Sequence, residues 1–504
     1  MYILRREKEK PSFIFFIILG MFSFCFLAVF SYYTSPFSEC DNGSDAAFFR
    51  LVGQGMTKGY LPYRDFFDMK GPWLFFIEYV GQLISYGRLG IFFIQWLNFF
   101  VSLIIICKLF DHYNIKNKFL QFGLLLPLAL ISCVTFEGGN LTEEFSLIPL
   151  LSSLYICVLF FENSDNNGEF WQKKVYQYAG AFYGFCFGFL LFIRVTNAAL
   201  ICAIIITIVI YLIICKKTVQ ILVSAGFFIV GLLLAVTPPI IFFAAKGLLR
   251  DMLNSVFVLG SMYAEEKTIL QHLEETIISE GNNRLFLLII PLLTPFLLRW
   301  RTWRERVLVS VGTLFTFFAI ASGNNYTHYY TLTIPLILLA EIAITESFRT
   351  KVNRRSIVAL GLAILMLLAQ SPNLIRRLGS AYLHLFEQSY YRTEQLVTDV
   401  SSRIPEEDYQ SVFCYNLNPA WYTYADLFPC IKYCGWQNHY ISLIPEIYDD
   451  LENTFSIHPP TWLVLPKSPG VLPAFLQEKL ELEYQLVYQN SSYSLYRCGI
   501  EGQN

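Results

Sequence analysis

Charged residues are scarce in this chain of 504 residues, because Asp, Glu, Lys and Arg together make up only 15% of it. A soluble globular domain carries about 25% charged residues, so the composition excludes an ordinary soluble protein. The formal net charge is −2 and no basic stripe is present, which excludes nucleic acid as an obvious partner. Apolar residues are abundant instead: 55% of the chain is hydrophobic and 17% is aromatic. We therefore expect a polytopic membrane protein.

A cysteine spacing typical of zinc sites is also lacking. Cys107, Cys186 and Cys202 lie inside apolar runs, where a thiol behaves as a small hydrophobe. Cys430 and Cys434 form the sequence CIKYC, and no His pair completes a metal site there. These two cysteines could form a disulfide in an oxidising compartment or remain free thiols, and the sequence leaves both open.

Long apolar runs dominate the first 370 residues. The first run is followed by no small-residue cleavage site and is long enough to span a bilayer, so we expect a retained anchor rather than a signal peptide. Runs of about 15 to 25 residues can cross a hydrocarbon core about 30 Å thick. About eleven spans are predicted on this basis, at residues 12–33, 88–110, 116–135, 142–161, 177–193, 196–215, 219–244, 283–299, 306–322, 328–346 and 356–371.

Clusters of basic residues set the expected topology, because Lys and Arg gather on the cytoplasmic side of membrane proteins. All clusters fall on one side if the short run Trp73–Gly87 does not cross, so we interpret that run as an interfacial or re-entrant helix. The N-terminus is then cytoplasmic, and the first loop (34–87) and the C-terminal region are extracytoplasmic. The clusters are Arg5/Arg6/Lys8/Lys10, Lys108/Lys116/Lys118, Lys173/Lys174, Lys216/Lys217, Arg299/Arg301/Arg304/Arg306 and Arg349/Lys351/Arg354/Arg355.

The composition changes near residue 372. Residues 372–504 carry many charged residues and Pro-rich turns, and short stretches such as TWLVLP alternate apolar with polar residues as strands do. The fold class predicted is an all-α membrane domain over 1–371, followed by a soluble α/β domain over 372–504 with its own core. The aromatic residues of CYNLNPAWYTYADL and KYCGWQNHY could stack on sugar rings or form that core, and both readings remain open.

The first outer loop is unusually rich in carboxylates and cations for a connection between spans. Polar residues at the ends of other predicted spans fall on the same side. Charged groups at a membrane boundary are costly, so they usually serve a substrate or pair with one another. We predict catalytic roles for Asp41 and Asp45, and substrate contacts for Arg64, Lys70, Glu143, Arg194, His328 and Tyr329.

Each candidate also has a structural alternative. The two aspartates could cap a helix, and Lys70 could merely precede a turn. Glu143 could occupy the first turn of a helix, where the dipole favours it. Arg194 could extend toward lipid headgroups, and His328 could be an interfacial anchor.

Carboxylates and cations at a lipid boundary suit a substrate linked to a lipid phosphate. Cations would hold the phosphate, which carries the charge of the leaving group. A carboxylate would accept the proton of an attacking hydroxyl. The spans, rich in Phe and Leu, would line a groove for a polyprenyl tail.

Several of these stretches resemble motifs of the GT-C membrane glycosyltransferases, over about residues 12–370. The bacterial branch related to protein O-mannosyltransferases and lipid A aminoarabinose transferases (glycosyltransferase family 39-like) is the nearest. Two departures are Asp41-Asn42, where many relatives have Asp-Glu, and K-G-P in place of the usual K-P-P. The matching stretches are DNGSDAAFF (41–49), GYLPYRD (59–65), KGP (70–72), FIRVTNAA (192–199) and HYYTLTIP (328–335).

The resemblance implies an enzyme of a bacterial plasma membrane that takes a sugar from a polyprenyl-phosphate donor. It would transfer the sugar with inversion, on the outer face, to a cell-envelope glycan, glycolipid or protein. By the same resemblance Asp41 is the base, and Lys70 and Arg194 meet the donor phosphate. Some relatives bind a divalent cation through acidic loop residues, so Mg²⁺ or Mn²⁺ is a possible cofactor, with Asp41, Asp45 and Glu143 as candidate ligands.

Two alternatives to an enzyme are a lipid-linked saccharide transporter or flippase, and a non-catalytic assembly partner. A transporter of this kind typically has charges near the bilayer midplane and broken helices in matching halves. Here the charges lie toward one face, and Pro238-Pro239 has no counterpart in a second half. These features favour the enzyme.

Overall fold

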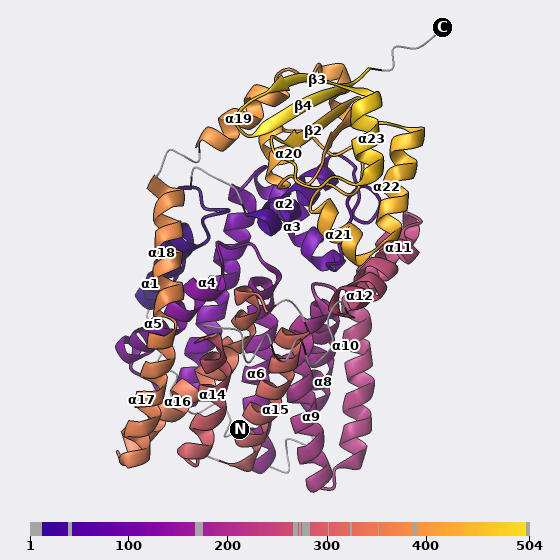
Figure 1. Cartoon of the computed structure of the whole chain (residues 1–504). Helices are drawn as coiled ribbons and strands as arrows, with labels where there is room; N and C mark the ends of the chain where they lie inside the picture. The colour runs from indigo at the N-terminus through magenta and orange to yellow at the C-terminus, as the bar shows by residue number, and fades with distance from the viewer. Residues whose placement is uncertain are drawn as a thin grey trace.

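The computed structural model describes residues 13–38, 43–166, 175–265, 271, 274, 283–300, 302–322, 325–350, 352–386 and 391–499. The described chain is mostly helical and has two parts: a long helical bundle and a smaller part with a β-sheet (Figure 1). The bundle contains α1 (Phe13–Phe30), α4 (Leu89–His112), α5 (Lys118–Thr135), α6 (Thr142–Asn166), α8 (Val175–Leu191), α9 (Ala199–Ile214), α10 (Thr218–Ala245), α14 (Phe286–Leu297), α15 (Trp303–Ala321), α16 (Ile334–Thr350) and α17 (Arg354–Ala369).

Every predicted span coincides with one of these helices, although not all are long enough to cross a bilayer alone. Among the described residues, seven helices are long and apolar enough to cross a membrane, or eight if the bent pair α17 and α18 (Ser371–Phe386) is one span. α14, for example, has only 12 residues. The multi-pass membrane architecture is confirmed, and the count of about eleven crossings stays a prediction.

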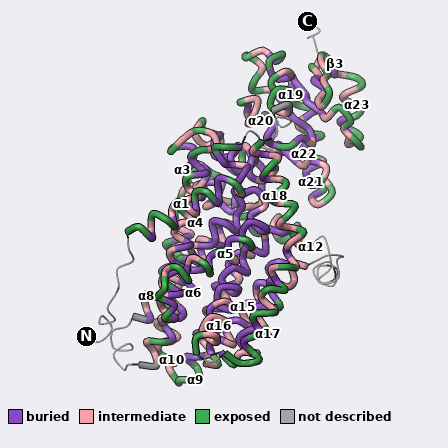
Figure 2. The backbone as a smooth tube through the Cα atoms, turned by 90° about the vertical axis from the view of Figure 1, so that its left-hand side faces the viewer, coloured by how far each residue is buried: buried purple, intermediate pink, exposed green. Residues whose placement is uncertain are grey.

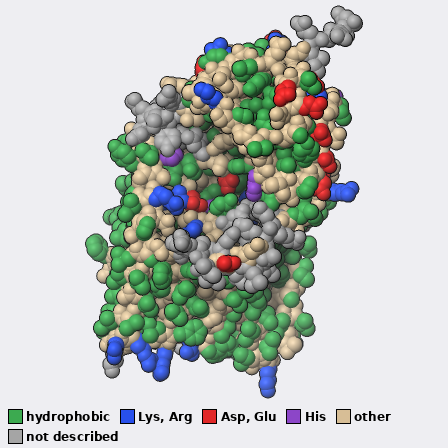
Figure 3. All heavy atoms as spheres, in the orientation of Figure 1, with side chains coloured by type: hydrophobic (Ala, Val, Ile, Leu, Met, Phe, Trp, Pro, Cys, Tyr) green, Lys and Arg blue, Asp and Glu red, His purple; other side chains and the backbone are tan. Residues whose placement is uncertain are grey.

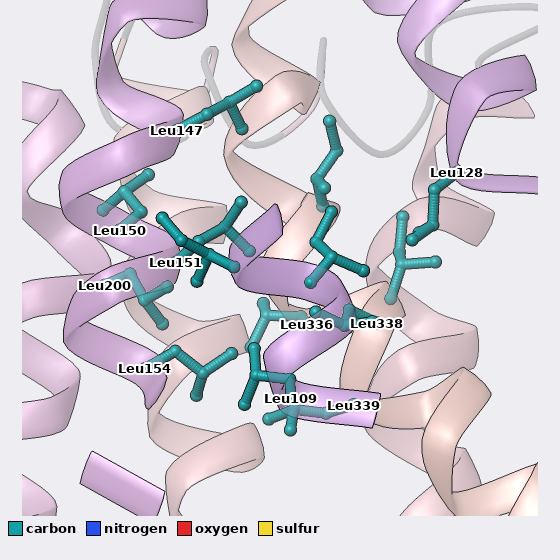
Figure 4. Close-up of a cluster of buried hydrophobic side chains, with 14 of the residues drawn as sticks. Leu109, Leu128, Leu147, Leu150, Leu151, Leu154, Leu200, Leu336, Leu338 and Leu339 are labelled. Carbon is teal, nitrogen blue, oxygen red and sulfur yellow. The ribbon is translucent and has the colours of Figure 1, made fainter. Parts of the chain in front are cut away.

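The interior of the bundle is apolar and so are its outward faces. Figure 2 shows buried residues along the inner sides of the helices and exposed residues outside. A helix that is hydrophobic all round is typical of a membrane span. On α6 four leucines at helical spacing, Leu147, Leu150, Leu151 and Leu154, are almost fully buried. They pack with leucines of α9 and α16, as Figure 4 shows.

Glycines bring α8 and α10 very close together. Gly180, Gly184 and Gly188 repeat every fourth residue on α8, a spacing that lets membrane helices approach each other. A Cβ atom at Gly184 would lie 1.9 Å from the carbonyl oxygen of Phe228 on α10. The backbone of α10 therefore occupies the space that a side chain would need.

The basic clusters that the structure describes gather at one end of the bundle. The guanidinium of Arg349, after α16, donates to the carbonyl of Asn114, between α4 and α5, at 2.7 Å. The ring of Trp300, between α14 and α15, lies 5.6 Å from that of Tyr113. Figure 3 shows Lys and Arg side chains along this lower end, away from the sheet. That this end faces the cytoplasm stays a prediction.

The first loop folds into two short helices, α2 (Ser44–Thr57) and α3 (Pro72–Ile84). They lie side by side between the bundle and the sheet (Figure 1). The 13 residues of α3 span about 20 Å at about 1.5 Å per residue, which is less than a hydrocarbon core of about 30 Å. This length agrees with the reading of Trp73–Gly87 as a helix that does not cross.

The C-terminal part contains a four-stranded sheet in the order β1-β2-β4-β3. β1 pairs with β2 in parallel, and the other two pairs are antiparallel. Its elements are α19 (Tyr391–Ser401), η6 (Glu406–Ser411), β1 (Val412–Cys414), α20 (Ala420–Ala425), α21 (Gln437–Leu443), α22 (Glu446–Ile457), β2 (Trp462–Pro466), α23 (Ala474–Leu482), β3 (Tyr484–Gln489) and β4 (Tyr493–Cys498). The predicted C-terminal α/β architecture is confirmed.

Most aromatic residues of CYNLNPAWYTYADL belong to the core of this part. Tyr415, Trp421 and Tyr422 are at most 2% exposed, so the core explanation holds for them. Cys430 and Cys434 are both free thiols in the structure.

The sheet-containing part packs on the first loop. The backbone N–H of Phe67 donates to the carbonyl of Lys432 at 2.9 Å, and Arg50 donates to the hydroxyl of Thr423 at 3.1 Å. α18 runs across the predicted boundary at 371/372 and packs against α1 and α5. The exact domain boundary therefore stays a prediction.

The remaining short elements connect the bundle helices near the sheet-containing part. They are η1 (Val195–Ala198), α11 (Leu249–Leu253), the π-helical turn η2 (Asn254–Leu259), α12 (Gly260–Glu265), η3 (Asn283–Leu285) and η4 (Thr327–Thr333).

Candidate functional site

A cavity of about 690 Å³ lies between the bundle and the sheet-containing part. Figure 3 shows a hollow at this level in which carboxylates, cations and a histidine are visible. The cavity is lined by α2, the segment before α3, the α5–α6 turn, the α8–α9 break, η2, η4, α18 and α21. Six of the predicted site residues line it: Asp45, Lys70, Glu143, Arg194, His328 and Tyr329.

The other two predicted residues do not contribute to the cavity as the structure describes it. Arg64 is not among the lining residues; it pairs with Asp65 at 2.7 Å, and its side chain is 51% exposed. Asp41 lies outside the described residues, so its place is not known. The roles of all eight residues stay predictions.

Asp45 enters the cavity from the first turn of α2. The N-cap of this helix is Gly43, which offers no side-chain cap, so Asp45 is not the capping residue. A carboxylate in the first turn still interacts favourably with the helix dipole. The helix thus fixes Asp45 at the cavity wall, where it is half-buried.

Lys70 is held by a buried carboxylate that sequence reasoning did not single out. Asp68 is 4% exposed; it accepts a hydrogen bond from the Lys70 backbone N–H at 2.8 Å and lies 3.8 Å from its Nζ. Burial raises the pKa of Asp68, although the Lys70 charge opposes this rise. Burial would lower the pKa of Lys70, but the charges of Asp68 and Asp45 outweigh it and raise that pKa. Lys70 therefore remains a cation in the cavity.

Gly71 allows the backbone next to Lys70 to approach the break between α8 and α9, where Arg194 lies. Its N–H donates to the carbonyl of Ile193 at 2.9 Å. A Cβ atom at position 71 would lie 2.2 Å from the carbonyl carbon of Phe192, so only glycine permits this backbone approach. The K-G-P motif thus joins the first loop to the α8–α9 break, with Lys70 and Arg194 in the same cavity.

Arg194 occupies the extended break between α8 and η1. Its Nη1 lies 2.7 Å from Oε1 of Glu143, a residue that is 1% exposed. The guanidinium also stacks on the ring of Tyr329, 3.8 Å from its centroid. The other carboxylate oxygen of Glu143 has no hydrogen-bond partner in the described part of the chain. Arg194 is therefore a paired cavity residue rather than one that extends to lipid headgroups.

His328 is oriented by Glu137, which sequence reasoning missed. Nδ1 of His328 lies 2.7 Å from Oε2 of Glu137, and the His328 backbone N–H donates to the same oxygen at 3.2 Å. Arg377 of α18 pairs with the other carboxylate oxygen. Burial would raise the pKa of Glu137, but the hydrogen bond and charge of His328 and the charge of Arg377 lower it to about 2. Glu137 is therefore ionised.

A signal for Glu137 was present in the sequence. It stands at the end of a predicted span, directly before Gly138 and Gly139, and all three residues have positive φ. An acidic residue beside two glycines at a membrane boundary is a turn that presents a carboxylate. Arg377 carried no such signal, because it stands next to Arg376 in an amphipathic stretch outside the predicted spans, where arginines are ordinary.

The described residues do not form a metal site. No group of three or more His, Cys, Asp or Glu side chains in the described ranges could hold a metal ion. Of the candidate ligands, Glu143 is paired with Arg194, and Asp45 is the other described one. Mg²⁺ takes near-octahedral oxygen ligands, a set that Asp45 and Glu143 alone do not supply. A divalent cation stays a prediction that depends on Asp41.

No family model and no curated protein matches this chain. Solved structures do match. ArnT from Cupriavidus metallidurans bound to undecaprenyl phosphate aligns with a TM-score of 0.57 and 11% identity, over 96% of this chain and 97% of that one. The same protein in the apo state aligns with a TM-score of 0.55, at the same identity and coverage. The chain therefore has the GT-C fold of ArnT, as the motif resemblance predicted.

Proposed function

We propose that this protein is an integral-membrane inverting glycosyltransferase of the bacterial plasma membrane. It takes a sugar from a polyprenyl-phosphate donor and transfers it to a cell-envelope acceptor on the outer face. One observation carries the proposal: Lys70 and Arg194, from distant parts of the chain, meet Asp45 in one cavity, at the end of the bundle away from the basic clusters. The GT-C fold, and the undecaprenyl phosphate bound to an ArnT of that fold, support it.

In this mechanism the two cations bind the donor phosphate. Lys70 supplies a compact charge, and Arg194 a planar guanidinium suited to paired contacts with phosphate oxygens. Both side chains are partly buried, so water screens them less than it would on an open surface, and they would stabilise the charge that develops on the leaving phosphate. Glu143 and Tyr329 keep the guanidinium in place.

The transfer itself is a single displacement. The acceptor hydroxyl oxygen attacks the anomeric carbon of the donor sugar while the bond from that carbon to the phosphate oxygen breaks. The polyprenyl phosphate leaves with the bonding electron pair, and the hydroxyl proton passes to a carboxylate. Asp41 is the proposed base and Asp45 its partner. Attack from the side opposite the leaving group inverts the anomeric carbon.

The remaining cavity groups bind and orient the substrates. Glu137 holds His328 through Nδ1, and the proposed role of His328 is to contact the donor phosphate or the acceptor. Any Mg²⁺ or Mn²⁺ would add positive charge at the phosphate, with Asp41 and Asp45 as proposed ligands. Arg64 does not line the cavity, and its contact with a substrate stays a prediction.

The test uses purified full-length protein in lipid nanodiscs with a panel of polyprenyl-phosphate sugars and envelope acceptors. Transfer of a saccharide is the expected result. Asp45→Asn should lower turnover and keep donor affinity, because a carboxamide has nearly the same shape but lacks the negative charge with which Asp45 would assist Asp41, the proposed base. If Asp45→Asn moves lipid-linked sugar across the bilayer as fast as the unaltered protein and neither transfers it, the protein is a transporter and the proposal is wrong.

A further inference from the structure

One part of the cavity wall comes from the C-terminal part of the chain. Three residues of the α21 region line it: Trp436, His439 and Tyr440. We call them the aromatic wall. Their rings contact residues of the first loop: that of Trp436 lies 6.1 Å from Phe48, and that of Tyr440 lies 5.2 Å from Phe67. The wall thus packs on the first loop and lines the same cavity as Asp45 and Lys70 of that loop.

The backbone at Trp436 is held in an unusual conformation. Its φ of 53° lies in the left-handed region, which is unfavourable for a residue with a bulky side chain and persists only where the surroundings impose it. Such strain clusters at ligand-binding sites. The neighbouring Gly435 sits against Pro419, where a Cβ atom would be 2.8 Å from the proline ring.

A buried glutamine anchors the segment that carries Trp436. Gln437 is fully buried; its amide nitrogen donates to the carbonyls of Cys414, at 3.0 Å, and Tyr433, at 2.5 Å. Its amide oxygen accepts the N–H of Asn416 at 2.6 Å. The bonds to Cys414 and Asn416 fasten the start of α21 to the end of β1, and the bond to Tyr433 closes the segment before α21. The indole is therefore presented to the cavity by a rigid support rather than by a free loop.

The chemistry of the wall differs from that of the rest of the cavity. Its three members include no Asp, Glu, Lys or Arg, whereas the rest of the lining carries Lys70, Arg194, Glu137 and Glu143. Aromatic rings with polar edges suit a ligand that has both an apolar face and hydrogen-bonding groups. A pyranose ring has a face of C–H groups and a rim of hydroxyls, so it meets this requirement without any charge.

A peptide is a poorer fit. Extended peptides are commonly bound along the edge of a sheet, which supplies main-chain hydrogen bonds. Within the described ranges, no residue that lines the cavity belongs to a strand. In the described part of the chain, the sheet therefore provides no strand edge inside the cavity with which a peptide could form main-chain hydrogen bonds.

We infer that the aromatic wall binds a sugar ring of the acceptor, so that the acceptor is a saccharide or a glycolipid rather than a polypeptide. This inference rests on the proposed function and adds the class of its second substrate. The donor phosphate occupies the side with the cations, and the acceptor ring packs on Trp436 with its hydroxyls toward His439 and Tyr440. In this arrangement the reactive hydroxyl of the acceptor points toward Asp45, which lines the same cavity.

The test measures binding of the full-length protein in nanodiscs to an array of neutral oligosaccharides and an array of envelope-protein peptides, with and without undecaprenyl phosphate. Trp436→Gly removes the indole while glycine adopts the left-handed conformation at little cost. We expect it to weaken saccharide binding about tenfold or more, the usual size for a central aromatic contact. Trp436→Phe, which keeps a ring, should restore most of the binding.

His439→Ala should also weaken saccharide binding, and His458→Ala is its matched control. His458 is an exposed histidine of the same part of the chain that does not line the cavity. Undecaprenyl phosphate affinity should be unchanged in all four variants. Unaltered saccharide binding by Trp436→Gly, capture of peptides instead of saccharides, or no saccharide binding by the unsubstituted protein would each overturn the inference. Failure to bind undecaprenyl phosphate would instead contradict the proposed function.

Discussion

The two ends of the bundle use charge in opposite ways. At the basic end, cations such as Lys216, Arg354 and Arg355 are exposed. At the cavity end, Arg194 is paired with a carboxylate that is 1% exposed. An exposed cation interacts weakly with its surroundings because water screens it. A buried pair is held in one geometry, and removing one partner is costly. The exposed cations of the basic end thus indicate how the protein is oriented in the membrane. The paired charges at the cavity end indicate a functional site.

Removing a cation should therefore lower turnover strongly at the cavity end and hardly at all at the basic end. This difference is the largest effect that we expect. Arg194→Ala should lower turnover about 100-fold or more, as expected when an oriented donor to a developing anion is lost. Arg355→Ala, the matched control at the basic end, should change turnover less than about twofold. Transfer assays on both variants in nanodiscs make the comparison. Equal losses at the two ends would contradict it.

The half-buried carboxylate Glu137 should make the stability of the protein depend on pH. Its pKa is lowered to about 2 in the folded protein, below the ordinary value of about 4.3. The stabilisation is thus fully present above about pH 5 and is lost as the pH falls toward 2. Glu137→Gln should flatten the fall of the melting temperature between pH 5 and about 2.5. A variant that melts with the same pH profile as the unsubstituted protein would show that the ionised group is not stabilising.

Helix packing next to the cavity should matter less than the charges but remain measurable. Gly184→Leu places a side chain where the carbonyl of Phe228 lies, so we expect a loss of about 1–3 kcal/mol and some loss of activity through movement of the Arg194 break. Gly226→Leu on α10 is the control, because nothing lies within 4 Å of a Cβ atom there. Thermal unfolding in detergent measures both. If the two variants unfold alike, the close approach of α8 and α10 is not stabilising.

The smallest effect is expected at Arg64. Its side chain is 51% exposed, and it forms an ion pair with its neighbour Asp65. Such an exposed pair stabilises a protein by about 0–1 kcal/mol. Arg64→Ala should leave turnover within about twofold, whereas Lys70→Ala, six residues later on the cavity wall, should not. Donor titrations on both variants separate binding from turnover. A large loss in Arg64→Ala would restore it as a substrate contact.

Sequence reasoning worked best where one property decides the structure. Each predicted apolar run became a helix, because a stretch without polar side chains must satisfy its backbone internally within a bilayer. Lys70, Arg194 and His328 could be proposed as candidates because polar and charged residues at a membrane boundary are costly, so they usually bind a substrate or pair with one another. The number of crossings was harder, since length alone does not show whether a short helix such as α14 spans the membrane.

Other parts of the site needed contacts between distant segments. Asp68 was visible in the charged loop, but its burial beneath Lys70 follows from the packing of the first loop against the α8–α9 break. Arg377 lies 240 positions from Glu137 in the chain, and nothing local links them. The KYCGWQNHY stretch looked no more suited to a cavity than the AWYTY stretch, whose Trp421 is buried.

The sequence by itself determined that this is a multi-pass membrane protein with a polar C-terminal part and charge concentrated in the first loop. Those properties follow from composition and from the length of apolar runs, which act residue by residue. The tertiary structure decided which charges meet, because a cavity is made by backbone approaches such as Gly71 on the α8–α9 break. It also decided that the residues of the aromatic wall line that cavity. The buried Gln437, which donates two hydrogen bonds and accepts one, anchors the segment that carries them.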